Sequence, residues 1–217
     1  MAKYAADFMV HTPWYKDGFI YQTGVGGASI ASTKYLAEHL RKDNIHIGVA
    51  MGGIAQAICE LQHEGLIDKI ADTQDFDMAS IEDIKTNPNH YEITTSQYAD
   101  PFNKGAYVNK LDYVILGALE VDTHFNVNVV VGSDGVITGA QGGHPDTAAG
   151  AKCTIVIAPL LQGRIPAICT ECTTVTTPGE TVDVVVTDYG IAINPRRQYI
   201  IDAVKDTDLP ICTIEEL

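Results

Sequence analysis

Four short segments combine glycines with polar side chains at spacings that suit the binding of an anion or an acyl group. The first, residues 22–29, reads Gln-Thr-Gly-Val-Gly-Gly-Ala-Ser and separates an apolar run from an amphipathic one. Glycines at such a junction let a ligand approach the backbone, and free N–H groups at a helix start favour an anion or an acyl oxygen. A tight turn without a ligand explains these glycines equally well. The candidate ligand contacts are Gly24, Gly26, Gly27 and Ala28.

This first segment does not complete the dinucleotide-binding fingerprint G-x-G-x-x-G. The residue three positions after Gly26 is Ser29, and no acidic residue on a following strand completes such a site. We therefore exclude a nicotinamide-binding role. A second junction of the same kind occurs at Gly52-Gly53, where a plain turn is the favoured interpretation.

The second segment, residues 73–77, reads Thr-Gln-Asp-Phe-Asp and follows a predicted strand. In open α/β sheets the carboxyl ends of the strands face the ligand crevice, so these side chains could handle a polar substrate. Asp77 is better interpreted as the cap of the next helix, a common position for aspartate. Gln74 is the candidate catalytic residue of this segment.

The third segment, residues 117–128, gathers Glu120, Asp122, Asn126 and Asn128 after a buried strand. On an extended chain, the even spacing of Asn126 and Asn128 places both on one side. Polar groups so close to a buried strand need partners, so they either line a polar site or tie down a loop. The sequence leaves both roles open.

The fourth segment, residues 139–148, reads Gly-Ala-Gln-Gly-Gly-His-Pro-Asp-Thr-Ala. Gly142, Gly143 and Asp146 are candidate contacts of the substrate or its thioester, and the two glycines allow close approach to the backbone. Either Asp146 or Thr147 can also start the next helix. His144 could act as a proton shuttle or as an oxyanion donor. A lone histidine is more often structural, but the adjacent glycines favour a functional role.

Other patterns are weaker. Cys169 and Cys172 have metal-like spacing, but two cysteines cannot close a tetrahedral site and no second pair follows, so we predict no metal site. No serine stands in a G-x-S-x-G elbow, which argues against a hydrolase triad. Each of the arginines Arg164, Arg196 and Arg197 could meet a carboxylate or a phosphate, and a solvated side chain is the default interpretation.

Apolar and amphipathic runs alternate along the chain, which is typical of an α/β domain with an open, mostly parallel twisted sheet and helices on both faces. The predicted strands are 19–21, 45–50, 69–72, 91–94, 113–118, 127–131, 154–158, 182–187 and 211–214. The predicted helices are 30–41, 54–63, 77–85 and 198–205. We expect residues 1–217 to form a single domain.

Composition limits the partners and the compartment. The 217 residues carry a net charge of −14, which argues against nucleic acid and anionic membranes as partners. No run approaches the roughly 20 apolar residues of a membrane span, and the first ten residues lack the pattern of a signal peptide. The five scattered cysteines favour a reducing cytoplasm over a disulfide framework.

Taken in order, the four segments resemble the CoA transferases and acetyl-CoA hydrolases. The sequences GFIYQTGVGGASIA, GALEVDTHFNVNV, GSDGVITGAQGGHPDTA and GRIP are more closely similar to the citrate lyase α-subunit family. The resemblance extends from about Ala5 to Leu217, and the combination of motifs is specific although each motif alone is not.

This resemblance implies a CoA-transferase-like fold and a role in acyl exchange. The expected reaction converts an acetyl-carrier thioester and citrate into a citryl-carrier thioester and acetate, and a separate β subunit then cleaves the product. The implied partners are that β subunit, the acyl carrier γ subunit and an N-terminal half of the α subunit. On this view the chain is a C-terminal half that acts on a pantetheine thioester and carries no covalent cofactor.

One departure from the wider family concerns the nucleophile. Many CoA transferases use a glutamate that attacks the thioester, and Gln74 stands in its place, or Asp75 if the alignment shifts by one residue. The resemblance to citrate lyase implies that a citrate carboxylate attacks instead, giving a mixed anhydride. Asn126, His144 and Gln74 are then candidate substrate contacts, and Glu120 is the remaining candidate for a covalent route. A citramalate lyase α subunit, an acetyl-CoA hydrolase and a carrier-docking domain remain alternatives.

Overall fold

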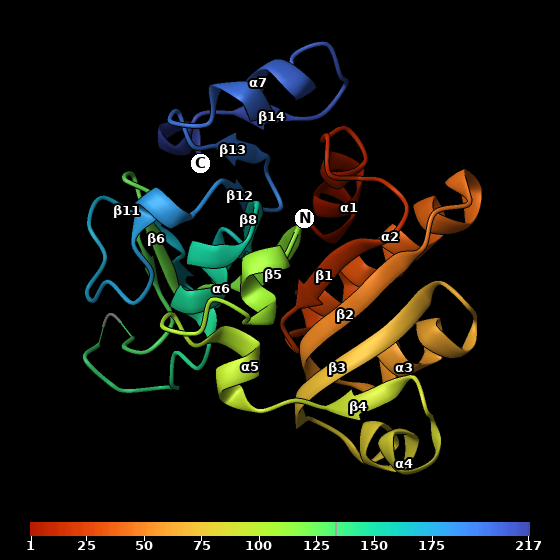
Figure 1. Ribbon diagram of the computed structural model, residues 1–217. Helices are drawn as coiled ribbons and strands as arrows, with labels where there is room; N and C mark the ends of the chain where they lie inside the picture. Colours follow the sequence, from red (N-terminus) through yellow and green to blue (C-terminus); the bar gives the residue numbers. More distant parts are fainter. Residues whose placement is uncertain (133) are drawn as a thin grey trace.

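The computed structural model describes residues 1–132 and 134–217, so Ser133, in the predicted turn at 132–135, lies outside the described residues. A nine-stranded sheet runs through the molecule (Figure 1), with the strand order β14-β13-β12-β8-β5-β1-β2-β3-β4. Its strands are β1 (Phe19–Thr23), β2 (Ile47–Ile54), β3 (Ile67–Asp75), β4 (His90–Glu92), β5 (Tyr113–Gly117), β8 (Cys153–Ile157), β12 (Val184–Val186), β13 (Ile191–Ile193) and β14 (Ile211–Cys212).

Neighbouring strands of this sheet are parallel, except that β12 and β13 are antiparallel. The strands β13 and β14 therefore run opposite to the others. The predicted class, a mostly parallel α/β sheet with helices on both faces, is confirmed.

The chain changes direction across the sheet at β1. It first builds β2, β3 and β4 on one side of β1, and then returns to build β5, β8 and β12 on the other side. The connections that leave the carboxyl ends of β1 and β5 therefore diverge. Such a switch point leaves a crevice beyond the strand ends, which is where open α/β sheets bind ligands.

Helices cover each face of the sheet and divide the core into two layers. On one face lie α1 (Ala2–Met9), α2 (Gly27–Asp43), α3 (Gln56–His63), α4 (Met78–Thr86) and α7 (Gln198–Val204). On the other face lie α5 (Thr95–Ala99), α6 (His144–Gly150) and the short helix η1 (Tyr107–Lys110). Figure 1 shows α5 and α6 in front of the sheet and α2 and α3 behind it.

The strand β5 explains why the sequence of a central strand has no polar face. Tyr113 and Ile115 belong to the core layer beneath α1 and α2. Val114 and Leu116 belong to the opposite layer. Successive side chains of a strand point to opposite faces, so a strand covered on both sides must be apolar throughout.

A small second sheet lies beside the main one, in the order β11-β6-β7. Its strands are β6 (Glu120–Asp122), β7 (Val127–Asn128) and β11 (Ile168–Cys169), and β9 (Leu161–Gln162) pairs with β10 (Ile165–Pro166) nearby. The chain also contains two short 3-10 helices, η2 (Gly179–Thr181) before β12 and η3 (Ile214–Glu216) after β14. The predicted strand at 127–131 ends early because the Asn128 side chain bonds the backbone of Val130 and Val131.

Side chains at the helix ends explain several boundaries. Asp77 caps α4 as predicted, because its carboxylate accepts a hydrogen bond of 2.9 Å from the Ser80 N–H. Asn44 ends α2 in the left-handed conformation that asparagine tolerates. The prediction that Asp146 or Thr147 starts a helix is wrong, since α6 begins at His144 with Pro145 in its first turn. Proline suits that position because the first turn leaves its N–H groups unpaired.

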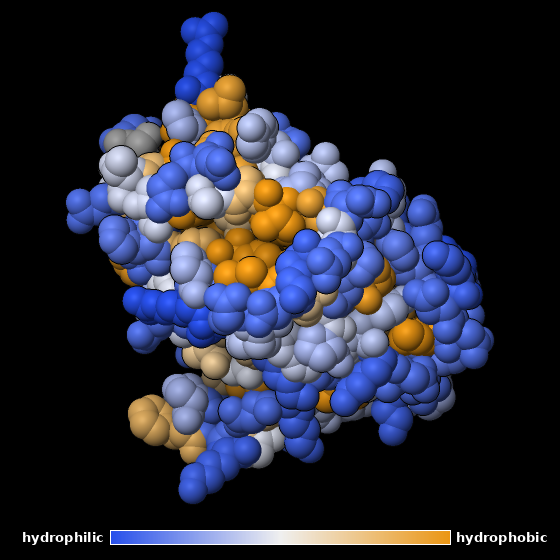
Figure 2. All heavy atoms as spheres, turned by 90° about the horizontal axis from the view of Figure 1, so that it is seen from above, coloured by the Kyte–Doolittle hydropathy of each residue, from blue (hydrophilic) through white to orange (hydrophobic). Residues whose placement is uncertain are grey.

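Hydrophobic atoms gather within an otherwise hydrophilic face in Figure 2, which views the molecule from the end that carries α7 and β14 in Figure 1. A groove of about 400 Å³ lies at this end and is lined in part by Ile193, Ile201 and Ile211. In the described part of the chain, no helix is long and apolar enough to cross a membrane.

The central position of β5 predicts the cost of opening a cavity there. Ile115 is 0% exposed. We expect Ile115→Ala to lower the free energy of unfolding by about 2–5 kcal/mol, and the matched Ile115→Val to lower it by about 0.5–1.5 kcal/mol. Urea denaturation measures both values. A loss below about 1 kcal/mol for Ile115→Ala would contradict this placement of β5.

Candidate functional site

A cleft of about 640 Å³ opens at the carboxyl ends of β1, β2, β3 and β5, at the switch point of the sheet. Its walls come from the ends of these strands, from Tyr98 on α5 and from the loop that leads into α6. The cleft is lined by Gln22, Thr23, Gly24, Val25, Gly26, Ser29, Gly53, Thr73, Gln74, Phe76, Tyr98, Leu116, Gly117, Ala118, Leu119, Val129, Ala140, Gln141, Gly142, Gly143 and His144.

The first glycine segment meets the cleft where α2 begins. Gly24 and Gly26 line the cleft, and Gly26 is the N-cap of the 17-residue helix α2. Gly27 and Ala28 belong to the first helical turn and do not line the cleft. The first N–H groups of a helix have no partner within it and carry the positive end of its dipole. This end of α2 can therefore stabilise an anion or a carbonyl oxygen.

Gln74 lies at the end of β3, on the same cleft. It pairs with Gly53 of β2, next to an irregularity that leaves Thr73 without a partner in β2. The Asp72 carboxylate fixes the local backbone by accepting a hydrogen bond of 2.6 Å from the Gln74 N–H. Asp75, the next residue, does not line the cleft. Of the two residues considered for the position of the family glutamate, Gln74 is therefore the one on the cleft.

The second glycine turn closes the cleft from the other side. Gly142 and Gly143 both line it, and Gly142 has a φ of 53° that favours glycine. The structure thus brings Gln74 and the glycine segments at 24–26 and 142–143 together around one space.

His144 lines the cleft but differs from the proton shuttle or oxyanion donor that the sequence suggested. Its Nε2–H donates to the Gly117 carbonyl oxygen over 2.9 Å, and its Nδ1 accepts from the Thr177 hydroxyl over 2.6 Å. Burial lowers the pKa of His144, which favours the neutral ring. With both nitrogens occupied, the imidazole joins the glycine turn to the end of β5 and offers no free site for a proton.

Glu120 and Asn126 do not line the cleft. Glu120 is 6% exposed, and its carboxylate accepts hydrogen bonds from Asn128 and from the Thr173 N–H and hydroxyl. Asn126 donates to Asp122 and accepts from the Gly179 N–H. The side chains of Glu120 and Asn126 thus tie loops to the second sheet.

Asp146 lies on an adjoining hollow of about 530 Å³, which shares Gln74, Tyr98 and the two glycines with the main cleft. Asp146 does not line the main cleft itself.

Sequence reasoning missed Gln22 and Tyr98. Gln22 Nε2 donates a hydrogen bond of 2.6 Å to the Tyr98 hydroxyl, although the two residues are 76 positions apart. A long amide at the end of an apolar strand was a usable signal for Gln22. Tyr98 lies in a short polar helix, and no local pattern marks it as a site residue.

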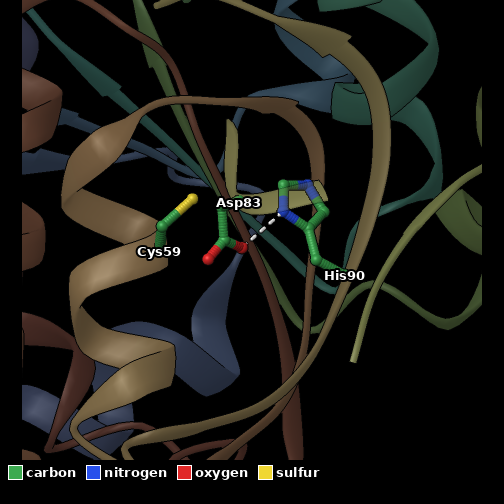
Figure 3. A group of neighbouring side chains, drawn as sticks. All are labelled: Cys59, Asp83 and His90. Carbon is green, nitrogen blue, oxygen red and sulfur yellow. Dashed lines mark hydrogen bonds and ion pairs between the residues drawn. The ribbon is translucent and has the colours of Figure 1, made fainter. Parts of the chain in front are cut away.

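A buried ionic network supports β3 and β4 beside this site. His90 lies between Asp83, with a contact of 2.7 Å, and Asp72, with one of 3.1 Å, and the exposed His63 reaches Asp83 over 2.6 Å. Cys59 of α3 points toward the same carboxylate (Figure 3), so Cys59, Asp83 and His90 have the atom types of a metal site. The His90 ring and the Asp83 carboxylate lie 2.7 Å apart, which is the distance of a direct hydrogen bond. We therefore interpret this contact as an ion pair and not as two ligands of a metal ion.

A second group with metal-like donors comprises Glu120, Cys169 and Cys172. Burial raises the pKa of both thiols, so neither is poised as a thiolate. The Cys172 sulfur lies 3.2 Å from the Asn126 carbonyl oxygen, to which it donates.

Comparison with known proteins identifies the family. A family model described as citrate lyase, alpha subunit, matches residues 1–217. The chain belongs to the citrate lyase α-subunit family. A citrate lyase alpha chain of Haemophilus influenzae is 50% identical over 217 residues, which make up all of this chain and 43% of the relative.

Solved structures agree with this family. A structure described as the α subunit of citrate lyase from Streptococcus mutans, in complex with citrate, superposes with a TM-score of 0.97 at 53% identity. The match covers 99% of this chain and 42% of that one. A Pseudomonas malonate decarboxylase hetero-tetramer shares only the fold, with a TM-score of 0.67 at 15% identity over 94% of this chain and 46% of its own. The fold is CoA-transferase-like, as predicted, and the chain spans less than half the length of its citrate lyase relatives.

The network around His90 predicts how stability depends on pH. Burial lowers the pKa of His90, but its hydrogen bonds to Asp72 and Asp83 outweigh burial and raise it overall. A raised folded-state pKa stabilises the fold below the unfolded value of about 6.5 and loses that contribution as the pH rises through the folded pKa. Burial raises the pKa of Asp83, but bonds from His90 and Asn87 lower it overall, so its contribution is lost as the pH falls below about 4.

We therefore expect the free energy of unfolding to be highest between about pH 4 and 6.5 and to fall by up to about 1.4 kcal/mol per pH unit above that window. His90→Gln should remove most of this alkaline slope and lower stability at pH 6. Chemical denaturation at pH 5, 6, 7 and 8 measures the free energy of unfolding of the wild-type protein and of the variant. The exposed His11 supplies the matched control, His11→Gln. An unchanged slope in His90→Gln would show that another group titrates.

Proposed function

We propose that this chain carries the acyl-exchange site of a citrate lyase α subunit, a citrate CoA-transferase. Its substrates are citrate and the acetyl thioester of a carrier protein, and its products are the citryl thioester and acetate. Membership of the family supports the general role. The description of the similar Streptococcus mutans structure as a complex with citrate supports the choice of acid.

The observation that carries the proposal is the chemistry of the cleft lining. None of the described residues that line it has a carboxylate, a thiol or a cationic side chain. The cleft therefore offers amide, hydroxyl and backbone groups, which can orient a thioester but do not form an acyl-enzyme by carboxylate or thiolate attack. The resemblance to the CoA transferases implies that Gln74, or Asp75 if the alignment shifts by one residue, stands in place of the family glutamate. Gln74 is the one that lines the cleft, and an amide in that place leaves the attack to the substrate.

The exchange then proceeds in two displacements. A citrate carboxylate oxygen attacks the acetyl carbonyl carbon, the C–S bond breaks, and the carrier sulfur leaves as a thiolate with the electron pair. The thiolate next attacks the citryl carbonyl of the mixed anhydride, the C–O bond breaks, and acetate leaves. The two displacements together transfer no proton, so the cleft needs no general base.

The residues of the cleft position the reactants and stabilise developing charge. We assign the stabilisation of the oxyanion in each displacement to the N–H groups of Gly26 and Ser29, the two residues at the start of α2 that line the cleft. The Gln74 amide is placed to hold a carboxylate or the thioester carbonyl. Holding two reactants together can supply about 7–11 kcal/mol of the barrier reduction, which suits a site that lacks its own nucleophile.

The neutral lining also bears on domain organisation. Citrate is a trianion at neutral pH, and an uncompensated charge in a cleft is costly. We propose that cationic groups of an N-terminal half face this cleft and that residues 1–217 form the single C-terminal domain. The chain spans 43% of the Haemophilus influenzae relative, which leaves room for such a half. The β subunit and the acyl carrier γ subunit complete the proposed complex in the cytoplasm, and the five cysteines are free thiols, as that compartment favours.

Labelling distinguishes this route from a covalent one. The assembled enzyme, incubated with the acetyl thioester and trapped with borohydride or hydroxylamine, should show no change in the mass of this chain. Gln74→Glu matches the wild-type side chain in size and restores a carboxylate, so we expect a trapped adduct on that residue. Mass spectrometry of tryptic peptides reads both results. A modified carboxylate in the wild-type chain would exclude the anhydride route.

Reconstitution tests the proposed division of the site. Residues 1–217 alone should exchange acetyl groups at least about 100-fold more slowly than the chain combined with an N-terminal half and the carrier protein, because both charge compensation and positioning are lost. Release of labelled acetate in the presence of citrate measures the rate. Acetate release without citrate would favour a hydrolase, turnover of citramalate alone would favour that acid, and no exchange by the complex would favour a carrier-docking domain.

A further inference from the structure

Gln22 and Tyr98 form a hydrogen-bonded pair in the wall of the cleft that is incomplete within the protein. Gln22 is 7% exposed, lines the cleft, and uses its Nε2–H to donate to the Tyr98 hydroxyl over 2.6 Å. Its other amide atom, Oε1, is buried and has no hydrogen-bond donor among the described residues. The pair therefore presents one unused acceptor.

The pair also presents one unused donor. The Tyr98 oxygen accepts from Gln22, and no acceptor for its own proton occurs among the hydrogen bonds of the described residues. Burial raises the pKa of Tyr98 to about 12, so the phenol keeps this proton at neutral pH. A neutral phenol can donate to a carboxylate or a carbonyl oxygen.

Two glycines make room for this pair and hold it in place. A Cβ atom at Gly52 would lie 3.0 Å from the Gln22 amide carbon, and Gly52 has a φ of +97° that disfavours other residues. A Cβ atom at Gly143 would lie 2.7 Å from the Tyr98 ring. The backbone thus packs directly against both side chains, which limits the directions in which the amide oxygen and the phenol can point.

A structural role alone does not account for this arrangement. Leaving a buried acceptor unpaired costs about 1–3 kcal/mol, and most buried side-chain polar atoms in proteins have a partner. A methionine of similar size would pack against Gly52 without that cost. Gln22 and Tyr98 both line one cleft, so an acceptor and a donor linked through one amide match a ligand that carries a donor and an acceptor on neighbouring atoms.

We propose that Gln22 and Tyr98 recognise an acid with a hydroxyl group beside a carboxylate. The ligand hydroxyl donates to Gln22 Oε1, and the neighbouring carboxylate accepts from the Tyr98 hydroxyl. This inference rests on the proposed function, in which the acid is citrate, whose central carbon carries both groups. Gln22 is then the residue that selects hydroxy acids, and Tyr98 orients the carboxylate.

The test compares citrate with propane-1,2,3-tricarboxylate, which differs only by lacking the hydroxyl. Both acids are measured as ligands of the assembled wild-type enzyme by calorimetry, and exchange activity is measured in parallel. We expect citrate to bind about 10- to 100-fold more tightly, the effect of one buried acceptor left unpaired. Equal affinity in the wild-type enzyme would overturn the inference without any substitution.

Variants assign the preference to the two residues. Gln22→Met removes the acceptor at similar size and should bring the two affinities to within about 2-fold of each other, whereas Tyr98→Phe should weaken both acids by a similar factor. Tyr107→Phe is the matched control, since the Tyr107 hydroxyl bonds Tyr91 and does not line the cleft. Gln22→Met with an unchanged preference for citrate would exclude this role for Gln22. If exchange runs in that case, the proposed function stands; if the wild-type enzyme neither exchanges nor binds either acid, the proposed function fails too.

Discussion

The divergence of the chain at the carboxyl ends of β1 and β5 is the constraint on which the rest of the site depends. Because β2 and β5 lie on opposite sides of β1, the connections that leave β1 and β5 diverge from the ends of these strands. The space between them is lined by residues at the strand ends, among them Gln22 of β1 and Gly117 of β5. His144 then bonds the Gly117 carbonyl and draws the second glycine turn over the same space. The cleft is therefore a consequence of strand order, and its chemistry follows from a few side chains.

Much of the fold was predictable from the sequence because apolar periodicity reports burial directly. The uncharged run at 113–118 indicates a strand covered on both faces, and β5 occupies that position. The prediction was wrong where a side chain competes for the backbone. Asn128 takes the hydrogen bonds that a longer strand at 127–131 would use, and such competition depends on contacts that a local pattern does not contain.

The site was less predictable from the sequence than the fold. Glycine-rich junctions at 24–26 and 142–143 could be recognised because glycine is needed where a backbone approaches another group, and both junctions line the cleft. The roles of Glu120 and His144 could not be read from the sequence, since a carboxylate or an imidazole is consistent with either catalysis or a satisfied buried network. The hydrogen-bond partners that bear on these roles are distant in sequence, as Thr173 is from Glu120.

Charged side chains lie away from the strand ends that form the cleft, in the residues that support β3 and β4. The described residues around the cleft leave it neutral, while the ionisable network of Asp72, Asp83 and His90 lies behind it in the support of β3 and β4. Buried carboxylates held by a histidine are compensated where they stand, so they fix the backbone without offering a nucleophile to the cleft. The Asp72 carboxylate shows how the two regions connect, because it accepts from both His90 and the Gln74 N–H. The described residues that line the cleft thus offer amides and N–H groups, and the carboxylates of this network are held by His90 behind it.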